Sequence, residues 1–100
     1  MIIIKSDEEI EMMRIPAKVT AEIMRDLESV IRPGISTHEI DQFVEQRILS
    51  AGMKPAFKGY GDFPATACVS PNAVVVHGIP SRKIILKEGD IVSVDAGAIY

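Results

Sequence analysis

The chain changes from a helical to an extended hydrophobic pattern near its middle, and this change restricts the fold to one class. Up to about residue 52, apolar side chains recur every three or four positions, as on amphipathic helices. From Met53 onward, short apolar runs alternate with prolines and glycines, as in strands joined by turns. Two helices followed by short antiparallel strands predict an α+β fold, with the helices packed on one face of a sheet.

Two helices are expected in the first half. Ser6 followed by Glu9 forms a capping box, in which each side chain can bond the other residue's backbone N–H. The same pattern recurs at Ser36 and Glu39. Pro16 should kink or divide the first helix, because proline removes a backbone hydrogen bond. Residues expected on the buried faces are Ile10, Met13, Ala17, Ala21, Met24 and Ile31 in the first helix and Ile40, Phe43, Val44 and Ile48 in the second. Residues expected on the exposed face of the second helix are Asp41, Glu45 and Arg47.

The second half is expected to form strands and loops. Residues 65–70 and 73–76 flank a turn signal and could pair as a hairpin. The loop at 54–64 contains three aromatic residues, which could either line a ligand pocket or cover the edge of the core. Residues 90–100 form an alternating apolar run with no turn or cap after it. A complete domain seldom stops in such a run, so we expect the chain to be a truncated domain.

Composition excludes several classes of protein. The hydrophobic fraction of 47% and the charged fraction of 25% are those of a soluble globular chain. No apolar run approaches the roughly 18 residues that a membrane helix needs. A net charge of −3 gives no general attraction to nucleic acid. The single cysteine, Cys68, excludes an internal disulfide framework and has no CxxC partner, so we expect a buried strand residue rather than a nucleophile. A cytoplasmic protein without membrane or nucleic-acid partners is expected.

Two residues stand out as candidates for chemistry. Asp95 lies within a predicted strand between Val94 and Ala96, where aspartate is disfavoured, and a buried carboxylate there would need a partner or a metal. Alternatively, Asp95 faces solvent. His77 precedes Gly78 at a predicted strand end, where an imidazole can serve as hydrogen-bond donor, acid, base or ligand. An exposed or hydrogen-bonded structural histidine is the alternative there.

Six segments, in order, form a pattern over almost the whole chain. They are Ile4 to Arg14, Arg32 to Thr37, Phe57 to Pro64, Cys68 to Asn72, Val75 to Pro80 and Leu86 to Asp95. The most specific combination is Val-His-Gly-Ile-Pro at 76–80 followed by Gly-Asp-Ile-Val-Ser-Val-Asp at 89–95. As a set, these segments resemble the N-terminal part of the type I methionine aminopeptidases.

The resemblance implies the N-terminal half of a pita-bread (creatinase/aminopeptidase) fold, in which two pseudo-symmetric α+β halves enclose a two-metal site. Residues 1–100 would then be an incomplete first half. The parent protein would remove the initiator methionine from nascent polypeptides by attack of a metal-activated water on the first peptide bond. Its partners would be nascent polypeptides with an N-terminal methionine, near the ribosome, and the missing second half of the domain.

The resemblance also implies roles for individual residues. Asp95 matches the first of five side-chain ligands that hold two divalent ions, such as Co, Mn, Fe or Zn. His77 matches the catalytic histidine that hydrogen-bonds the substrate beside the scissile amide. Positions that line the methionine pocket are Phe57, Tyr60, Phe63 and Cys68. Positions where backbone carbonyls help to hold a monovalent cation in some members are Asn72 and Val74.

Four of the family's five metal ligands have no counterpart in this chain. Metal affinity comes from several preorganised ligands, so we expect the 100-residue chain to be inactive by itself. Three other functions remain open. They are a metal-free pita-bread module that binds peptides or proteins, a related peptidase that cleaves before proline, and a self-contained α+β interaction domain.

Overall fold

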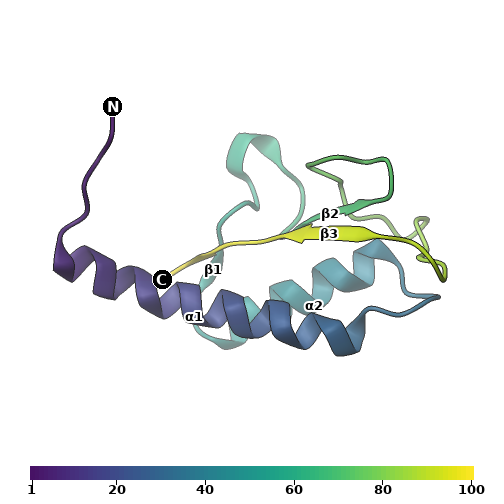
Figure 1. Cartoon of the computed structure of the whole chain (residues 1–100), viewed down its shortest axis with the longest axis horizontal. Coiled ribbons are helices and arrows are strands. Elements are labelled where there is room, and N and C mark those ends of the chain that lie inside the picture. Colours follow the sequence, from purple (N-terminus) through teal and green to yellow (C-terminus); the bar gives the residue numbers. More distant parts are fainter.

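Two helices and four short strands form two layers, with residues 57–63 and 72–79 on the far side of the sheet from the helices (Figure 1). Residues 84–86 return to the helices, where the N–H of Thr37 donates to the carbonyl of Ile84 and the N–H of Leu86 donates to the carbonyl of Ile35. The computed structural model describes all 100 residues. The elements are α1 (Asp7–Val30), α2 (Thr37–Ser50), β1 (Lys54–Pro55), the 3₁₀ turn η1 (Tyr60–Asp62), β2 (Cys68–Pro71), β3 (Val92–Asp95) and β4 (Ala98–Ile99). The predicted α+β class is confirmed. Neither helix has both the length and the apolar character needed to cross a membrane.

The first helix begins as predicted but is not divided. The backbone N–H of Ser6 donates to Glu9 Oε1 at 2.9 Å, and the N–H of Glu9 donates to Ser6 Oγ at 3.2 Å. The helix continues through Pro16 to Val30, so of the two predicted alternatives the division into two helices is wrong, and the kink stays a prediction. The carbonyl of Met12, which Pro16 leaves without its helical donor, lies on an exposed turn where water can hydrate it.

The buried face of α1 also differs from the prediction. Ile23 and Leu27, near its C-terminal end, are buried, whereas Ile10 and Met13 are exposed. The reason is visible in Figure 1, where the N-terminal half of α1 extends past the sheet and α2 and is covered by neither. The apolar residues do recur at helical spacing, but no other element of the chain packs against them in this part of α1.

The second helix follows the prediction more closely, with one correction. Ser36 Oγ accepts from the N–H of Glu39 at 3.0 Å and caps α2. The predicted buried face is confirmed, with Phe43 only half-buried. Asp41, predicted to be exposed, is buried with 5% of its surface accessible. Gly52, with φ of +75°, follows the helix end as predicted for a left-handed C-terminal residue.

Two pairs of antiparallel strands form the second layer. Strand β2 pairs with β3, so that Cys68 lies opposite Asp95 and Val69 lies opposite Val94. Strand β1 pairs with β4, which follows β3 after Ala96–Gly97. The core lies between the helices and the sheet. It consists of Ile23, Leu27, Ile35, Ile40, Val44, Ile48, Met53, Ala67, Val69 and Leu86, with Val92, Val94, Ala96 and Ala98 packed against it.

The segment after β2 folds back instead of forming a hairpin strand. The chain turns at Asn72, where φ is +50°, and residues 73–76 form no strand, so that prediction is wrong. Gly78 then returns to the edge of β2. The N–H of Val69 donates to the carbonyl of Gly78 at 2.9 Å, and the N–H of Gly78 donates to Ser70 Oγ at 3.0 Å. These contacts fix the return of the loop beside β2.

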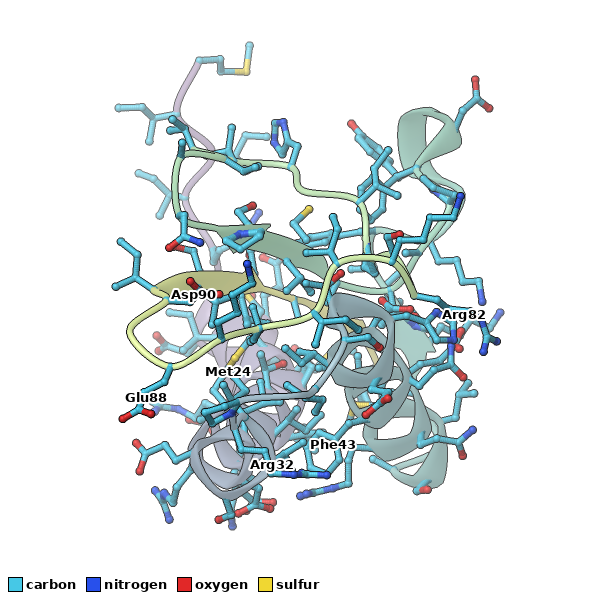
Figure 2. The ribbon with its side chains drawn as sticks, turned by 90° about the vertical axis from the view of Figure 1, so that its right-hand side faces the viewer. Met24, Arg32, Phe43, Arg82, Glu88 and Asp90 are labelled. Atoms are coloured by element: carbon cyan, nitrogen blue, oxygen red, sulfur yellow. The ribbon has the colours of Figure 1, made fainter.

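Figure 2 shows the same layers from the end, with the helices on one side of the strands and the loops at 57–63 and 72–79 on the other. Because side chains alternate along β3, Val92 and Val94 face the helices. Ser93 and Asp95 therefore face the loops. This alternation brings Asp95 to the side of the sheet where the aromatic loop also lies.

Candidate functional site

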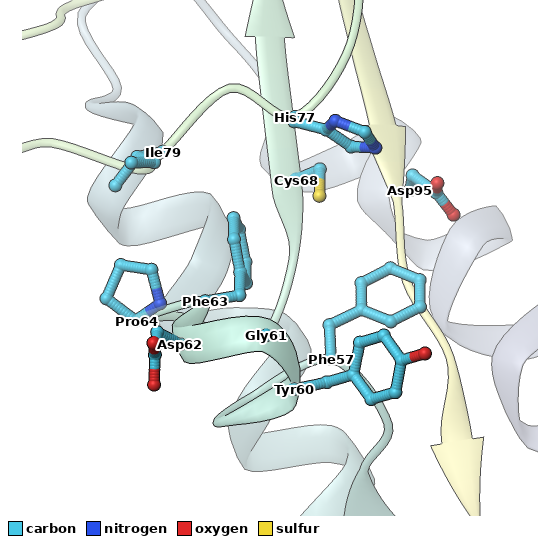
Figure 3. Close-up of a pocket in the computed structure, with 10 residues that line it drawn as sticks. All are labelled: Phe57, Tyr60, Gly61, Asp62, Phe63, Pro64, Cys68, His77, Ile79 and Asp95. Atoms are coloured by element: carbon cyan, nitrogen blue, oxygen red, sulfur yellow. The ribbon is translucent and has the colours of Figure 1, made fainter.

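A cavity of about 640 Å³ lies on the loop side of the sheet (Figure 3). The residues around it that the sequence singled out are Phe57, Tyr60, Phe63, Cys68, His77 and Asp95. They come from four separate parts of the chain: the aromatic loop, β2, the loop after β2, and β3. The structure thus brings these six residues together in one place, although they span 39 positions of the sequence.

The aromatic wall is built by the loop from Phe57 to Pro64, here called the pocket loop. Gly59 and Gly61 have φ of +84° and +55°, a region that glycine enters without steric cost. The N–H of Gly59 donates to the carbonyl of Phe63 at 2.9 Å, which closes the loop on itself. Figure 3 shows that the closed loop places Phe57, Tyr60 and Phe63 at one end of the cavity.

Gly97 lies against Ala56 and the ring of Phe57, and its tighter approach is to Ala56. A Cβ at position 97 would lie 3.5 Å from Phe57 Cε1 and 3.2 Å from the Cβ of Ala56. The space beside Gly97 is therefore taken up by Ala56 and Phe57, which begin the aromatic wall.

Cys68 and Asp95 lie opposite each other in β2 and β3, at the other end of the cavity. Burial, and to a smaller extent the negative charge of Asp95, raises the pKa of the Cys68 thiol above its ordinary value. Both effects disfavour the thiolate, which is the nucleophilic form. Cys68 is therefore a buried neutral sulfur at the edge of an aromatic cavity, and its expected burial is confirmed.

His77 lies on the rim of the cavity above Cys68, on the side of Asp95 (Figure 3). It is exposed and has φ of +58°, so it occupies a left-handed conformation that few non-glycine residues adopt. Its neighbour Gly78 is fixed to β2 by two hydrogen bonds. The backbone therefore holds the imidazole at the rim, where it can reach a molecule that enters the cavity.

The metal-binding groups of the chain are too few for a divalent site. No three His, Cys, Asp or Glu side chains come together in a group that could hold a metal ion. Asp62, Cys68, His77 and Asp95 line the cavity, but Figure 3 shows Asp62 on the opposite side from Asp95, and protonated Cys68 is a poor ligand. Divalent ions in proteins take four or more ligands. The residues of this chain therefore do not fit a two-metal centre without ligands from elsewhere.

Asn72 and Val74 do not line the cavity. Asn72 is held against the start of β3, because its N–H donates to the carbonyl of Ile91 at 2.8 Å and its Oδ1 accepts from the N–H of Ile91 at 3.2 Å. The N–H of Val74 donates to the carbonyl of Pro71 at 3.1 Å. Both residues are exposed in this turn.

Sequence reasoning missed several residues that complete the site. Ile79 and Pro64 add apolar surface to the cavity, and no local pattern distinguishes them from loop residues. Asp41 lies behind the site on α2, where its Oδ1 accepts from the N–H of Thr66 at 2.9 Å and of Ala67 at 2.8 Å. Its only sequence signal is a carboxylate beside the apolar stripe of a helix, which is an ordinary pattern.

The sequence and the fold have close counterparts among known proteins. The chain is 50% identical over 99 residues to a methionine aminopeptidase of Clostridium acetobutylicum. This match covers 99% of the chain but only 40% of that protein. The crystal structure of a methionine aminopeptidase from Thermotoga maritima superposes on the whole chain with a TM-score of 0.95 and 45% identity, again over 40% of its own length. The chain therefore spans about 40% of the length of these relatives.

A dipeptidase with the same fold is less similar to the chain than the methionine aminopeptidases are. An Xaa-Pro dipeptidase from Bacillus anthracis matches with a TM-score of 0.76 and 26% identity, well below the values for the methionine aminopeptidases. The fold is thus that of part of a pita-bread aminopeptidase. The model of metallopeptidase family M24 matches residues 11–100. The recognition made from sequence is confirmed, and the chain belongs to metallopeptidase family M24.

Proposed function

We propose that the chain is the first pseudo-symmetric half of a methionine aminopeptidase domain, and that the complete domain removes the initiator methionine from nascent polypeptides. The observation that carries the proposal is the cavity, in which three aromatic rings lie at one end and the neutral sulfur of Cys68 lies at the other end with His77 and Asp95. The names of the relatives at 45–50% identity support the same activity.

The chemistry of the cavity suits a methionine side chain. A thioether is apolar, unbranched and polarizable, and it makes favourable contacts with aromatic rings. With the side chain among Phe57, Tyr60 and Phe63, the first peptide bond of the substrate would lie near the rim. His77 could there donate a hydrogen bond to the scissile amide, which would stabilise charge that develops during cleavage. This arrangement assigns binding to the loop and positioning to the histidine.

Asp95 is proposed as the first metal ligand of the complete enzyme. Two divalent ions, of Co, Mn, Fe or Zn, would supply Lewis acidity and an activated water when bound. The other ligands would come from polypeptide outside these 100 residues, since the chain itself gathers too few. Asn72 and Val74 remain proposed carbonyl donors for a monovalent cation. The 100-residue chain alone is proposed to be inactive.

The surface of the chain supports the proposal that a second half covers it. The accessible surface is 7009 Å², whereas a folded monomer of 10.9 kDa exposes about 5,600 Å². The excess of about 1,400 Å² exceeds the roughly 800 Å² that one partner buries in a stable interface. The radius of gyration, 14.5 Å, is likewise above the about 13 Å of a 100-residue domain.

A chimera would test the proposed activity directly. This chain would replace the matching 40% of the Clostridium acetobutylicum methionine aminopeptidase, and the product would be assayed on a Met-Ala-Ser peptide with Co or Mn. We expect cleavage after methionine by the chimera and none by the 100-residue chain alone. A folded chimera that does not cleave would contradict the proposed function, and turnover by the chain alone would contradict its inactivity.

The same chimera separates the enzyme from a metal-free binding module, which the lack of a metal-ligand group in the chain would also permit. Asp95→Asn should abolish cleavage if Asp95 is a ligand, while leaving the apolar cavity intact. A module that only binds peptides would keep its affinity and show no metal dependence. Action on nascent chains in the cytoplasm, near the ribosome, is proposed from the family resemblance of the sequence.

A further inference from the structure

One face of α2 holds the pocket loop at both of its ends. Beyond the end of the loop, Asp41 Oδ1 accepts from the backbone N–H groups of Thr66 and Ala67, at 2.9 and 2.8 Å. Near its start, Lys58 Nζ donates to Glu45 Oε1. Asp41 and Glu45 are four positions apart on the helix, so they lie one above the other on the same face. The aromatic loop is thus attached to α2 on either side.

The two attachments differ in strength. Asp41 is 5% exposed, and its carboxylate satisfies two buried N–H groups that have no other acceptor in the structure. Hydrogen bonds to a charged group in such a setting are among the stronger ones, and leaving both N–H groups unpaired would be costly. The side chain of Lys58 is half exposed, and exposed ion pairs contribute little to stability. The hydrogen bond from Lys58 nevertheless lowers the pKa of Glu45, so the two groups interact as a charged pair.

The attachment at Asp41 also adjoins the strand that carries the far end of the cavity. Ala67 immediately precedes Cys68, the first residue of β2, which lies opposite Asp95. A shift of the backbone at 66–67 would move both the exit of the pocket loop and the position of Cys68. The distance between the aromatic end and the sulfur end of the cavity therefore depends on this contact.

We infer that Asp41, assisted by Glu45, is a positioning residue that sets the shape of the methionine pocket from behind. Neither side chain lines the cavity, so neither would touch the substrate. Their effect on methionine recognition would be indirect, through the positions of Tyr60, Phe63 and Cys68. The link to methionine rests on the proposed function, whereas the mechanical role in holding the loop does not.

Amide hydrogen exchange of the 100-residue chain would test the mechanical role. In Asp41→Ala, we expect exchange of the Thr66 and Ala67 amides, and of the pocket-loop amides, to become about tenfold faster or more. Asp41→Asn keeps an oxygen acceptor without the charge and should give an intermediate increase. The matched control is Asp26→Asn, which removes an exposed carboxylate that pairs with Arg47 and should leave the pocket loop unchanged.

Asp41→Asn decides the question if Asp41→Ala does not fold, as judged by loss of helical circular dichroism. Exchange at residues 57–67 that is no faster in either folded variant than in Asp26→Asn would overturn the inference. In the active chimera, Asp41→Asn should raise KM for Met-Ala-Ser more than it lowers kcat. An unchanged KM together with faster exchange would overturn the link to methionine recognition. Lack of any cleavage by the wild-type chimera would count against the proposed function, while the exchange result would still decide the role of Asp41.

Discussion

Among the seven glycines of the chain, Gly78 is the one whose replacement the neighbouring backbone directly opposes. A Cβ at this position would lie 2.1 Å from the carbonyl oxygen of Val69 and 2.9 Å from the Cα of Ser70. Because both are backbone atoms of β2, neither can move aside without disturbing the sheet. Gly78 therefore determines how closely the loop that carries His77 approaches the strand.

Gly78→Ala should detach this loop from β2 and destabilise the chain by about 1–3 kcal/mol, as overpacking usually does. We expect faster amide exchange at Val69, whose N–H donates to residue 78. Gly52→Ala is a suitable control, because it has no contact within 4 Å and carries only the cost of a left-handed backbone, about 1 kcal/mol. Equal exchange at Val69 in both variants would contradict the prediction.

The reactivity of the Cys68 thiol provides a second prediction at the scale of one residue. Its raised pKa has burial as the main cause and the charge of Asp95 as the lesser one. Alkylation by iodoacetamide at pH 8 should therefore be slower than for a free thiol of ordinary pKa. Asp95→Asn should accelerate the reaction, but only in part, because burial remains. A Cys68 that reacts as fast as glutathione would contradict this assignment.

The same shift has a consequence for stability. A thiol whose pKa is higher in the folded than in the unfolded chain favours folding in its protonated state. This contribution is fully present below the unfolded-state pKa and is lost as the pH rises through the folded-state pKa. Stability should thus fall at alkaline pH, and Cys68→Ala should remove that part of the decline in denaturant titrations at successive pH values.

At the scale of elements, the sequence predicts correctly the features that depend on nearby residues. Its predictions are wrong for features that depend on residues far along the chain. The capping residue Ser6 and the glycine at 52 act within a few positions, so the sequence alone predicts where the helices begin or end. The predicted hairpin strand at 73–76 is absent because β2 pairs instead with β3, some 20 residues later in the sequence. The predicted exposure of Asp41 is wrong because its partners, Thr66 and Ala67, lie 25 and 26 positions away in the sequence.

The candidate site shows the same division. Asp95 could be singled out because aspartate is unusual within a strand, and His77 because of the glycine that follows it. Their meeting with the aromatic loop depends on β2–β3 pairing and on the return of Gly78, which no local pattern encodes. The resemblance to known aminopeptidases predicted that these residues belong to one site. The structure shows that they line one cavity.

Pro16 offers a prediction about α1 as a whole. The helix continues through it despite a cost of up to about 3 kcal/mol relative to alanine. Pro16→Ala should therefore raise the free energy of unfolding by about 1–3 kcal/mol and slow amide exchange between residues 10 and 20. Pro33→Ala, which lies beyond the helix end, should have no such effect on α1. Unchanged exchange in α1 would show that proline costs nothing there.

At the scale of the whole molecule, the outer edge of β3 and β4 determines how the chain meets other polypeptides. The N–H of Val69 donates to Gly78, away from β3, so the pair Val69–Val94 is one without mutual hydrogen bonds. The backbone groups of Val92, Val94 and Ala96 therefore point away from β2. Such an unpaired row of donors and acceptors readily pairs with another strand.

This edge predicts that the 100-residue chain associates in solution and that the association is specific to one surface. Ile91 and Ile99 flank β3 and β4 and are exposed. Replacing both by lysine should yield a monomer by sedimentation, because lysines on an edge strand oppose pairing. Ile2 and Ile3 are also exposed but lie ahead of α1 and outside the strands, so their replacement by lysine should leave the association intact. In the chimera, a second half would cover the edge, and the unmodified sequence should then be monomeric. A monomeric 100-residue chain would mean that its exposed edge is stable without a partner, and would weaken the proposal that a second half completes it.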